Sequence, residues 1–140
     1  MTRMKDAKTA EEMVDSWRDE LLPGGNIDGS KQRFKVYIDE KPEIIEDIAH
    51  RPMVKILERD ILDPKTRELV VIGMLAMVKS PGIILHVQAA LQAGCTKEEV
   101  MEVIYLSGYQ SGKCNVAAVG EFLTEGFKQA EKLSAKAAII

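Results

Sequence analysis

The sequence predicts an all-α protein. Residues with high helix propensity, such as Ala, Leu, Glu, Lys and Met, are plentiful, whereas only 7 of the 140 residues (1 Trp, 3 Tyr and 3 Phe) are aromatic. Strands are built mainly from aromatic and β-branched residues, so this composition disfavours a sandwich or a barrel. Proline and glycine stand where helices would begin and end. We expect one domain, residues 1–140, of about six to seven helices.

The first 40 residues of the chain predict two helical segments. Residues 8–21 show an apolar stripe, and the following Pro23-Gly24-Gly25 ends the helix. The stripe consists of Met13, Trp17 and Leu21. A flexible loop is expected over residues 26–30, followed by a short helical piece around residues 32–38.

Proline residues indicate where helices begin in the next part of the chain. Pro42 can serve as the first residue of a helix that runs to about Arg59, with an irregularity near Pro52. Asp63 then caps and Pro64 opens a helix that continues through Lys79. This central helix has no polar face, because its residues from 69 to 78 are almost all apolar.

The last three helices are predicted from their caps. Ser80-Pro81 repeats the cap-then-proline pattern, and Gly94 ends that helix in a left-handed conformation. Thr96 and Glu99 form a capping box, in which each side chain accepts from the other residue's amide, and the helix runs from Lys97 to about Tyr109. The chain is then interrupted or bent at Gly108, Gly112 and Asn115. A final helix covers about Val116–Ala138.

Charge is distributed unevenly along the chain. The formal net charge is −3, which gives no basic surface for nucleic acid or for an anionic membrane. Residues 1–62 hold 11 Lys and Arg against 14 Asp and Glu, whereas residues 63–140 hold 8 of each. Lys79 is the only charged residue between Glu68 and Lys97, and Lys113 the only one between Glu102 and Glu121. Helices with so few charges must bury most of their surface, and a chain of this size has too few other residues to bury it. We therefore predict that contacts between subunits bury the rest, in a homo-oligomer.

The chain is expected to be cytoplasmic. Its longest nearly uninterrupted apolar run, residues 69–78, is far shorter than the roughly 20 residues that cross a bilayer. Its first residues are charged rather than apolar, so we expect no export. The two cysteines, Cys95 and Cys114, match no usual zinc or dithiol spacing, and we expect buried thiols. No motif indicates a metal or a cofactor.

His86 is the foremost candidate for chemistry. It lies in the middle of a helix in an uncharged stretch, and Gly82 and Ala90 one turn away on either side leave room beside it. It is either an acid/base group in a small pocket or a core histidine with satisfied ring nitrogens. Glu68 is its candidate partner, although a glutamate there also complements the helix dipole. His50 is expected to be an ordinary, partly exposed residue.

Two cations could bind a substrate carboxylate. Arg67 adjoins Glu68 and could clamp a carboxylate, or it could form a surface ion pair. Lys79 either faces the substrate or extends into solvent from a helix end, and the second alternative is favoured.

Two segments together resemble the carboxymuconolactone decarboxylase family, most specifically over residues 55–112, with residues 1–50 as an N-terminal helical extension. They are Leu62-Asp63-Pro64-Lys65-Thr66-Arg67-Glu68-Leu69 and, after an apolar helix, His86-x3-Ala90-x3-Gly94-x-Thr96-x2-Glu99-Val100-x-Glu102. The resemblance implies an alkylhydroperoxidase D-like helical bundle whose subunits form trimers or hexamers.

The family has two chemical branches. In the alkylhydroperoxidase D-like branch a C-x-x-C pair precedes the histidine, but Lys79 and Gly82 stand at those positions here. The chain is more similar to the decarboxylase branch, which removes carbon dioxide from a carboxylated unsaturated lactone. By that resemblance His86 is the acid, Glu68 orients it or returns its proton, and Arg67 or Lys79 holds a carboxylate. The alternatives are a peroxidase-like antioxidant protein that uses Cys95 or Cys114 and a non-catalytic oligomeric binder of small ligands.

Overall fold

The computed structural model describes residues 3–21 and 28–139, and all regular structure in this part of the chain is helical. The predicted all-α fold is therefore confirmed. If the consecutive helical segments over residues 42–57 are counted as one and the short 3-10 turn at Met4–Asp6 is left out, the described residues form seven helices. The chain divides into two compact units, Met1–Ile61 and Leu62–Ile140, which are described separately. The assignment of residues 1–140 to one domain stays a prediction.

The first unit is built from short helices. They are the 3-10 turn η1 (Met4–Asp6), α1 (Ala10–Leu21), α2 (Asp28–Glu40), α3 (Pro42–Ile44), the π-helical η2 (Ile45–His50) and α4 (Arg51–Leu57). Residues 26–27 and the predicted stop at Pro23-Gly24-Gly25 lie outside the described residues. The prediction of a loop over residues 28–30 was wrong, because α2 already begins at Asp28. Asp and Ser are favourable residue types at the start of a helix, which explains why this polar stretch is helical.

The predicted irregularity near Pro52 takes the form of a π-helical turn, η2, directly before α4. Proline has no amide hydrogen and its ring clashes with the carbonyl of the preceding turn. A wider turn before Pro52 accommodates both restrictions. The helix ends at Leu57 rather than at Arg59.

The core of the first unit surrounds Trp17. Its buried apolar residues are Met4, Met13, Val14, Trp17 and Ile45. The indole Nε1 of Trp17 donates to Nδ1 of His50 over 2.8 Å, and Nε2 of His50 lies 2.9 Å from the carbonyl oxygen of Met4. Because Nδ1 accepts, Nε2 carries the hydrogen and donates to Met4. His50 is 5% exposed, so the expectation of a partly exposed residue was wrong.

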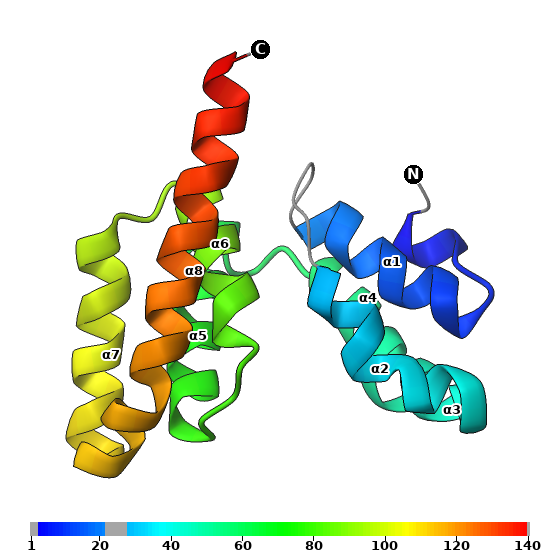
Figure 1. Ribbon diagram of the computed structural model, residues 1–140, viewed down its shortest axis with the longest axis horizontal. Helices are drawn as coiled ribbons and strands as arrows, with labels where there is room; N and C mark the ends of the chain where they lie inside the picture. Colours follow the sequence, from blue (N-terminus) through cyan, green and yellow to red (C-terminus); the bar gives the residue numbers. More distant parts are fainter. Residues whose placement is uncertain (1–2, 22–27, 140) are drawn as a thin grey trace. The chain divides into compact units, whose positions relative to one another are not determined.

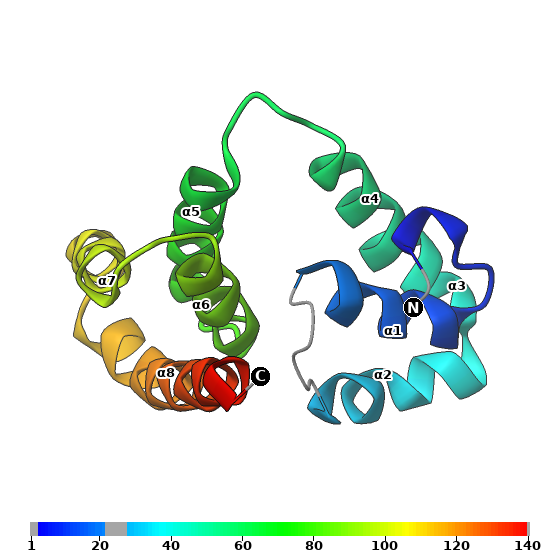
Figure 2. The ribbon, with the colours of Figure 1, turned by 90° about the horizontal axis from the view of Figure 1, so that it is seen from above.

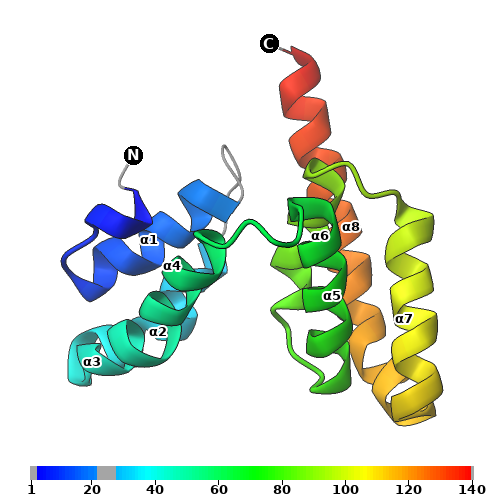
Figure 3. The same ribbon diagram turned by 180° about the vertical axis from the view of Figure 1, so that it is seen from behind.

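The second unit contains four helices that run in alternate directions (Figures 1, 2 and 3). They are α5 (Pro64–Met77), α6 (Ile83–Gln92), α7 (Lys97–Ser111) and α8 (Lys113–Ile139). Their buried residues form one core: Ile72, Ala76, Ile83, Val87, Ala90, Cys95, Val100, Ile104, Val119 and Leu123. None of the described helices combines the length and the apolar composition needed to cross a membrane.

Helix α5 begins as predicted and ends earlier than predicted. The carboxylate of Asp63 accepts from the amide of Thr66, and Pro64 is the first helical residue. The helix ends at Met77, and Lys79 follows it with a positive φ of 55°. The amide of Ser80 donates to the carbonyl of Leu75, so Lys79 occupies the left-handed position that usually holds glycine.

Helix α6 begins later than predicted. The hydroxyl of Ser80 accepts from the amide of Gly82, and this turn delays the helix to Ile83, two residues after the predicted start at Pro81. Its end is as predicted. Gly94 has a φ of 103°, and the amide of Cys95 donates to the carbonyl of Ala90.

The boundary between α7 and α8 lies at Gly112 alone, where φ is 87°. The expected interruption at Gly108 was wrong, because this residue lies inside α7 and lets α8 approach: a Cβ there would lie 2.6 Å from Cγ2 of Val116. Asn115 lies inside α8 and does not interrupt it, and its side-chain amide donates to the carbonyl of Met77 at the end of α5.

Half of the predicted capping box is present. The hydroxyl of Thr96 accepts from the amide of Glu99, as expected. The side chain of Glu99 does not return to Thr96 but forms an ion pair with Lys65, with 3.0 Å between Nζ and Oε1. A charged partner offers a stronger hydrogen bond than a neutral amide does, so the carboxylate turns away from the cap.

Candidate functional site

Glu68 and His86 form a direct carboxylate–imidazole pair. Nδ1 of His86 lies 2.7 Å from Oε2 of Glu68, which joins the second turn of α5 to the first turn of α6. The side chain of Glu68 is 6% exposed and that of His86 is 20% exposed. The structure therefore brings together the two residues that the sequence singled out.

The pairing fixes which ring nitrogen of His86 is available. Because the Glu68 carboxylate can only accept, Nδ1 carries the hydrogen. Among the described residues none hydrogen-bonds to Nε2. Nε2 is therefore the nitrogen that can exchange a proton with a bound molecule.

The space beside His86 is smaller than the flanking small residues suggested. Ala90 is fully buried in the core of the second unit. A Cβ on Gly82 would lie 3.2 Å from Oγ of Ser80 and 3.5 Å from Cδ1 of Leu75. Neither position opens a wide cavity, so a substrate would approach His86 from its partly exposed side.

The two predicted substrate-binding cations lie differently with respect to this pair. Arg67 is adjacent to Glu68 in sequence, but consecutive helical residues point about 100° apart and do not face each other. Lys79 is exposed and lies beyond Met77, the last residue of α5. Along the helix axis, Met77 is about 13 Å from Glu68. Substrate binding by either residue stays a prediction.

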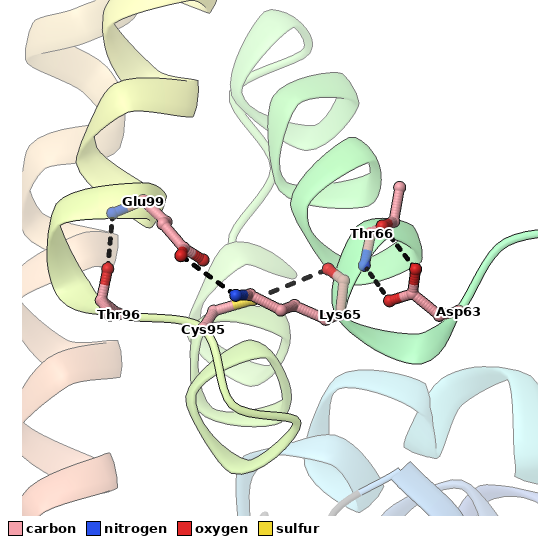
Figure 4. A network of polar contacts seen from close by, with 6 residues as sticks. All are labelled: Asp63, Lys65, Thr66, Cys95, Thr96 and Glu99. Carbon is pink, nitrogen blue, oxygen red and sulfur yellow. Dashed lines mark hydrogen bonds and ion pairs between the residues drawn. The ribbon is translucent and has the colours of Figure 1, made fainter.

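A third cation, Lys65, lies closer to Glu68 on the helix surface. The two residues are three positions apart in α5, so they are neighbours on one face. Figure 4 shows the Lys65 side chain reaching from α5 to the carboxylate of Glu99 in α7. The sequence reasoning missed Lys65, although its spacing from Glu68 was the signal that could have identified it.

Cys95 lies in the same neighbourhood. Its sulfur donates to the carbonyl oxygen of Lys65 over 3.6 Å. Burial raises the pKa of the Cys95 thiol, and the nearby carboxylate of Glu99 raises it further. Cys95 is therefore held as a thiol, whereas a reactive cysteine needs a lowered pKa.

The second cysteine lies in a different environment. Cys114 is exposed near the start of α8, and both cysteines are free. The expectation of buried thiols is thus confirmed for Cys95 and wrong for Cys114. In the described part of the chain, His, Cys, Asp and Glu side chains form no group of three or more that could hold a metal ion.

The fold and the pair together define a class of protein: a small all-helical protein with a carboxylate–imidazole pair between two antiparallel helices. The sequence model of the carboxymuconolactone decarboxylase family matches residues 51–125, more than half of the chain. The chain belongs to this family. The matched region runs from α4 into α8 and contains both Glu68 and His86. No significant match was found among curated proteins or among solved structures.

Proposed function

We propose that the protein is a carboxymuconolactone decarboxylase-like enzyme that performs acid/base chemistry, and specifically decarboxylation, on a small carboxylated lactone. The observation that carries this proposal is the Glu68–His86 pair, a histidine hydrogen-bonded to a buried carboxylate with its other nitrogen unengaged. Family membership supports the assignment to this class of proteins. The reaction itself is inferred from the resemblance to the decarboxylase branch of the family, and the pair provides an acid group for it.

The proposed reaction needs one proton delivered to carbon. The bond between the ring carbon and its carboxylate breaks, carbon dioxide leaves, and the electron pair spreads into the conjugated lactone. Nε2 of protonated His86 donates its proton to the carbon skeleton, and solvent returns the proton to the ring. Glu68 holds the ring through Nδ1 and compensates the positive charge of the imidazolium.

The test is a decarboxylation assay with carboxymuconolactone on the wild type and three variants. We expect His86→Ala to lower kcat by about a hundredfold or more, since general acid catalysis contributes 10²–10⁴-fold. Glu68→Gln should cause a smaller loss, because glutamine still accepts from Nδ1 but carries no charge. Gln92→Ala, an exposed residue of the same helix, is the matched control and should retain full activity. Decarboxylation that survives in His86→Ala would refute the proposed role.

A parallel assay addresses the two alternatives. Peroxide reduction with a dithiol donor, tested before and after alkylation of both cysteines, measures peroxidase-like activity. The raised pKa of Cys95 weighs against that alternative for this residue. If the wild type performs neither reaction, a non-catalytic small-ligand binder becomes the better description.

We also propose that the chain forms a homo-oligomer, of which trimers and hexamers are the forms expected from the family resemblance. The support comes from large apolar side chains that stay exposed on the second unit. They include Val70, Met74, Val78, Met101, Tyr105, Leu106 and Tyr109. Met101, Tyr105 and Tyr109 of this set line one groove, and exposed apolar side chains that gather in this way mark an interface more often than free surface.

A further inference from the structure

We propose that Lys65 is the residue that binds a substrate carboxylate beside His86. The inference rests on the proposed function, since it names the substrate feature that the same site would recognise: a carboxylate on the side of the molecule next to the atom that is protonated. It depends on four observations about α5 and its neighbours.

The first observation is the position of Lys65 on α5. Lys65 precedes Glu68 by three residues, so the two side chains lie one turn apart on the same face. Glu68 holds the imidazole ring of His86 in place by accepting a hydrogen bond from Nδ1 over 2.7 Å. A carboxylate held by Lys65 therefore lies within the reach of a small molecule from the imidazole.

The second observation is a shared neighbour. Cys95, which follows the end of α6, donates to the backbone carbonyl of Lys65 over 3.6 Å. Helix α6 also carries His86, which contacts Glu68. The N-terminal part of α5 is therefore tied to the α6 segment at Lys65 as well as at Glu68.

The third observation is that the ammonium group of Lys65 can be recruited. Its present partner is Glu99, at 3.0 Å, and the two side chains are 42% and 38% exposed. An ammonium group has three hydrogens, so Lys65 can donate to a substrate carboxylate while it keeps its contact with Glu99. Oε1 of Glu99 contacts Lys65, whereas Oε2 is buried and has no hydrogen-bond partner among the residues that the structure describes. The pair is therefore a single contact that leaves the other hydrogens of the ammonium free to turn.

The fourth observation concerns the competing cations. Arg67 is separated from Glu68 by about 100° around α5, and Lys79 lies beyond the far end of the same helix. Between Glu68 and Lys97 the sequence offers no cation other than Lys79. Lys65 is thus the basic residue of α5 that shares the face of Glu68.

The test separates binding from catalysis by using a stable probe. Glutarate, a dicarboxylate that cannot lose carbon dioxide in this way, is titrated while the imidazole signals of His86 are followed by NMR. The chain has only two histidines, so the signals are easily assigned. We expect Lys65→Met to weaken glutarate binding at least tenfold and Lys65→Arg to restore it to within threefold. The dimethyl ester of glutarate should not bind.

The controls distinguish a specific role from a general loss of charge. Lys97→Met removes a lysine of the same unit that forms a comparable ion pair, 3.1 Å from Glu131, and should leave binding unchanged. Arg67→Met and Lys79→Met test the competing assignments. In turnover of carboxymuconolactone, Lys65→Met should raise KM about tenfold while kcat changes less than threefold. Circular dichroism verifies that each variant is folded.

The outcomes are distinguishable from those of the proposed function. Glutarate binding that depends on Lys65, in a protein without decarboxylase activity, would refute the proposed reaction and support the assignment of Lys65. Unchanged binding in Lys65→Met, an equal loss in Lys79→Met or Arg67→Met, or no binding of glutarate to the wild type would each overturn that assignment.

Discussion

Cys95 and Cys114 occupy opposite environments, which makes them a sensitive probe of the second unit. Cys95 is 5% exposed and follows the end of α6, whereas Cys114 is exposed at the start of α8. Burial and the Glu99 carboxylate raise the pKa of the Cys95 thiol. Because the thiolate is the nucleophile, a raised pKa lowers the reactive fraction at every pH below it.

We expect iodoacetamide at pH 7.5 to modify Cys114 well before Cys95, by tenfold or more in rate. As pH rises, the rate at Cys95 should continue to increase beyond the ordinary titration range of a cysteine, since its pKa is shifted upward. Mass spectrometry of the separate peptides measures both rates. Equal modification rates of the two cysteines at neutral pH would contradict the conclusion that the Cys95 thiol is buried and has a raised pKa.

Individual site residues were predictable to different degrees. His86 stood out as a polar residue in an uncharged stretch and Glu68 as the charged residue at the edge of that stretch, and the structure joins them. Lys65 was not predicted, since it belongs to a charged segment where a lysine is ordinary. Its neighbourhood depends on Glu99 and Cys95, about 30 residues further along the chain.

At the scale of helices, α5 and α6 end in the same way with different residues. Lys79 and Gly94 each follow their helix with a positive φ, 55° and 103° respectively. The left-handed conformation costs an L-residue roughly 1–2 kcal/mol, whereas glycine adopts it without that penalty. Lys79 thus carries a strain that Gly94 avoids.

Lys79→Gly should stabilise the second unit by about 1 kcal/mol, and Gly94→Ala should destabilise it by about the same amount. The cost of Gly94→Ala is conformational only, because an added Cβ would have nothing within 4 Å. Urea unfolding followed by circular dichroism measures both changes. Fluorescence cannot replace it, since Trp17, the one tryptophan, lies in the first unit. A Lys79→Gly variant less stable than the wild type would contradict the strain argument.

Helix starts and stops were predictable wherever a local signal determines them. Asp63, Thr96 and Gly94 act through their own side chains or backbone, and all three were confirmed. Lys79 was not predicted to be left-handed, because lysine has no preference of its own for this conformation. The return contact of Glu99 to Thr96 was not formed, because Lys65 from another helix is its partner instead.

At the scale of the whole molecule, the exposed apolar side chains of the second unit are the basis of the proposed self-association. Tyr105 and Tyr109 are 75% and 81% exposed. They border a groove of about 410 Å³ between α7 and α8, which Met101, Ile104, Gly108 and Val116 also line. Two exposed tyrosines represent roughly 300 Å² of surface, a large part of the patch that a typical monomer tolerates.

We expect the wild type to form oligomers at micromolar concentration and Tyr109→Glu to shift them toward smaller species, because a charge in an apolar interface must be desolvated. Gln110→Glu places the same charge at the next, exposed residue and should leave the assembly intact. Light scattering coupled to size exclusion measures the masses. A wild-type protein that is a stable monomer would contradict the proposal of self-association.

The sequence by itself determined the all-α class, most helix boundaries, the family and the two polar residues of the candidate pair, because helix periodicity, caps and isolated polar residues are local properties. Only the tertiary structure decided that Glu68 meets His86, that Lys65 and Cys95 share their neighbourhood, and that His50 is buried against Trp17. These contacts join residues 18 to 33 positions apart. Side chains so distant along the chain meet only where packing of the core fixes one helix against another.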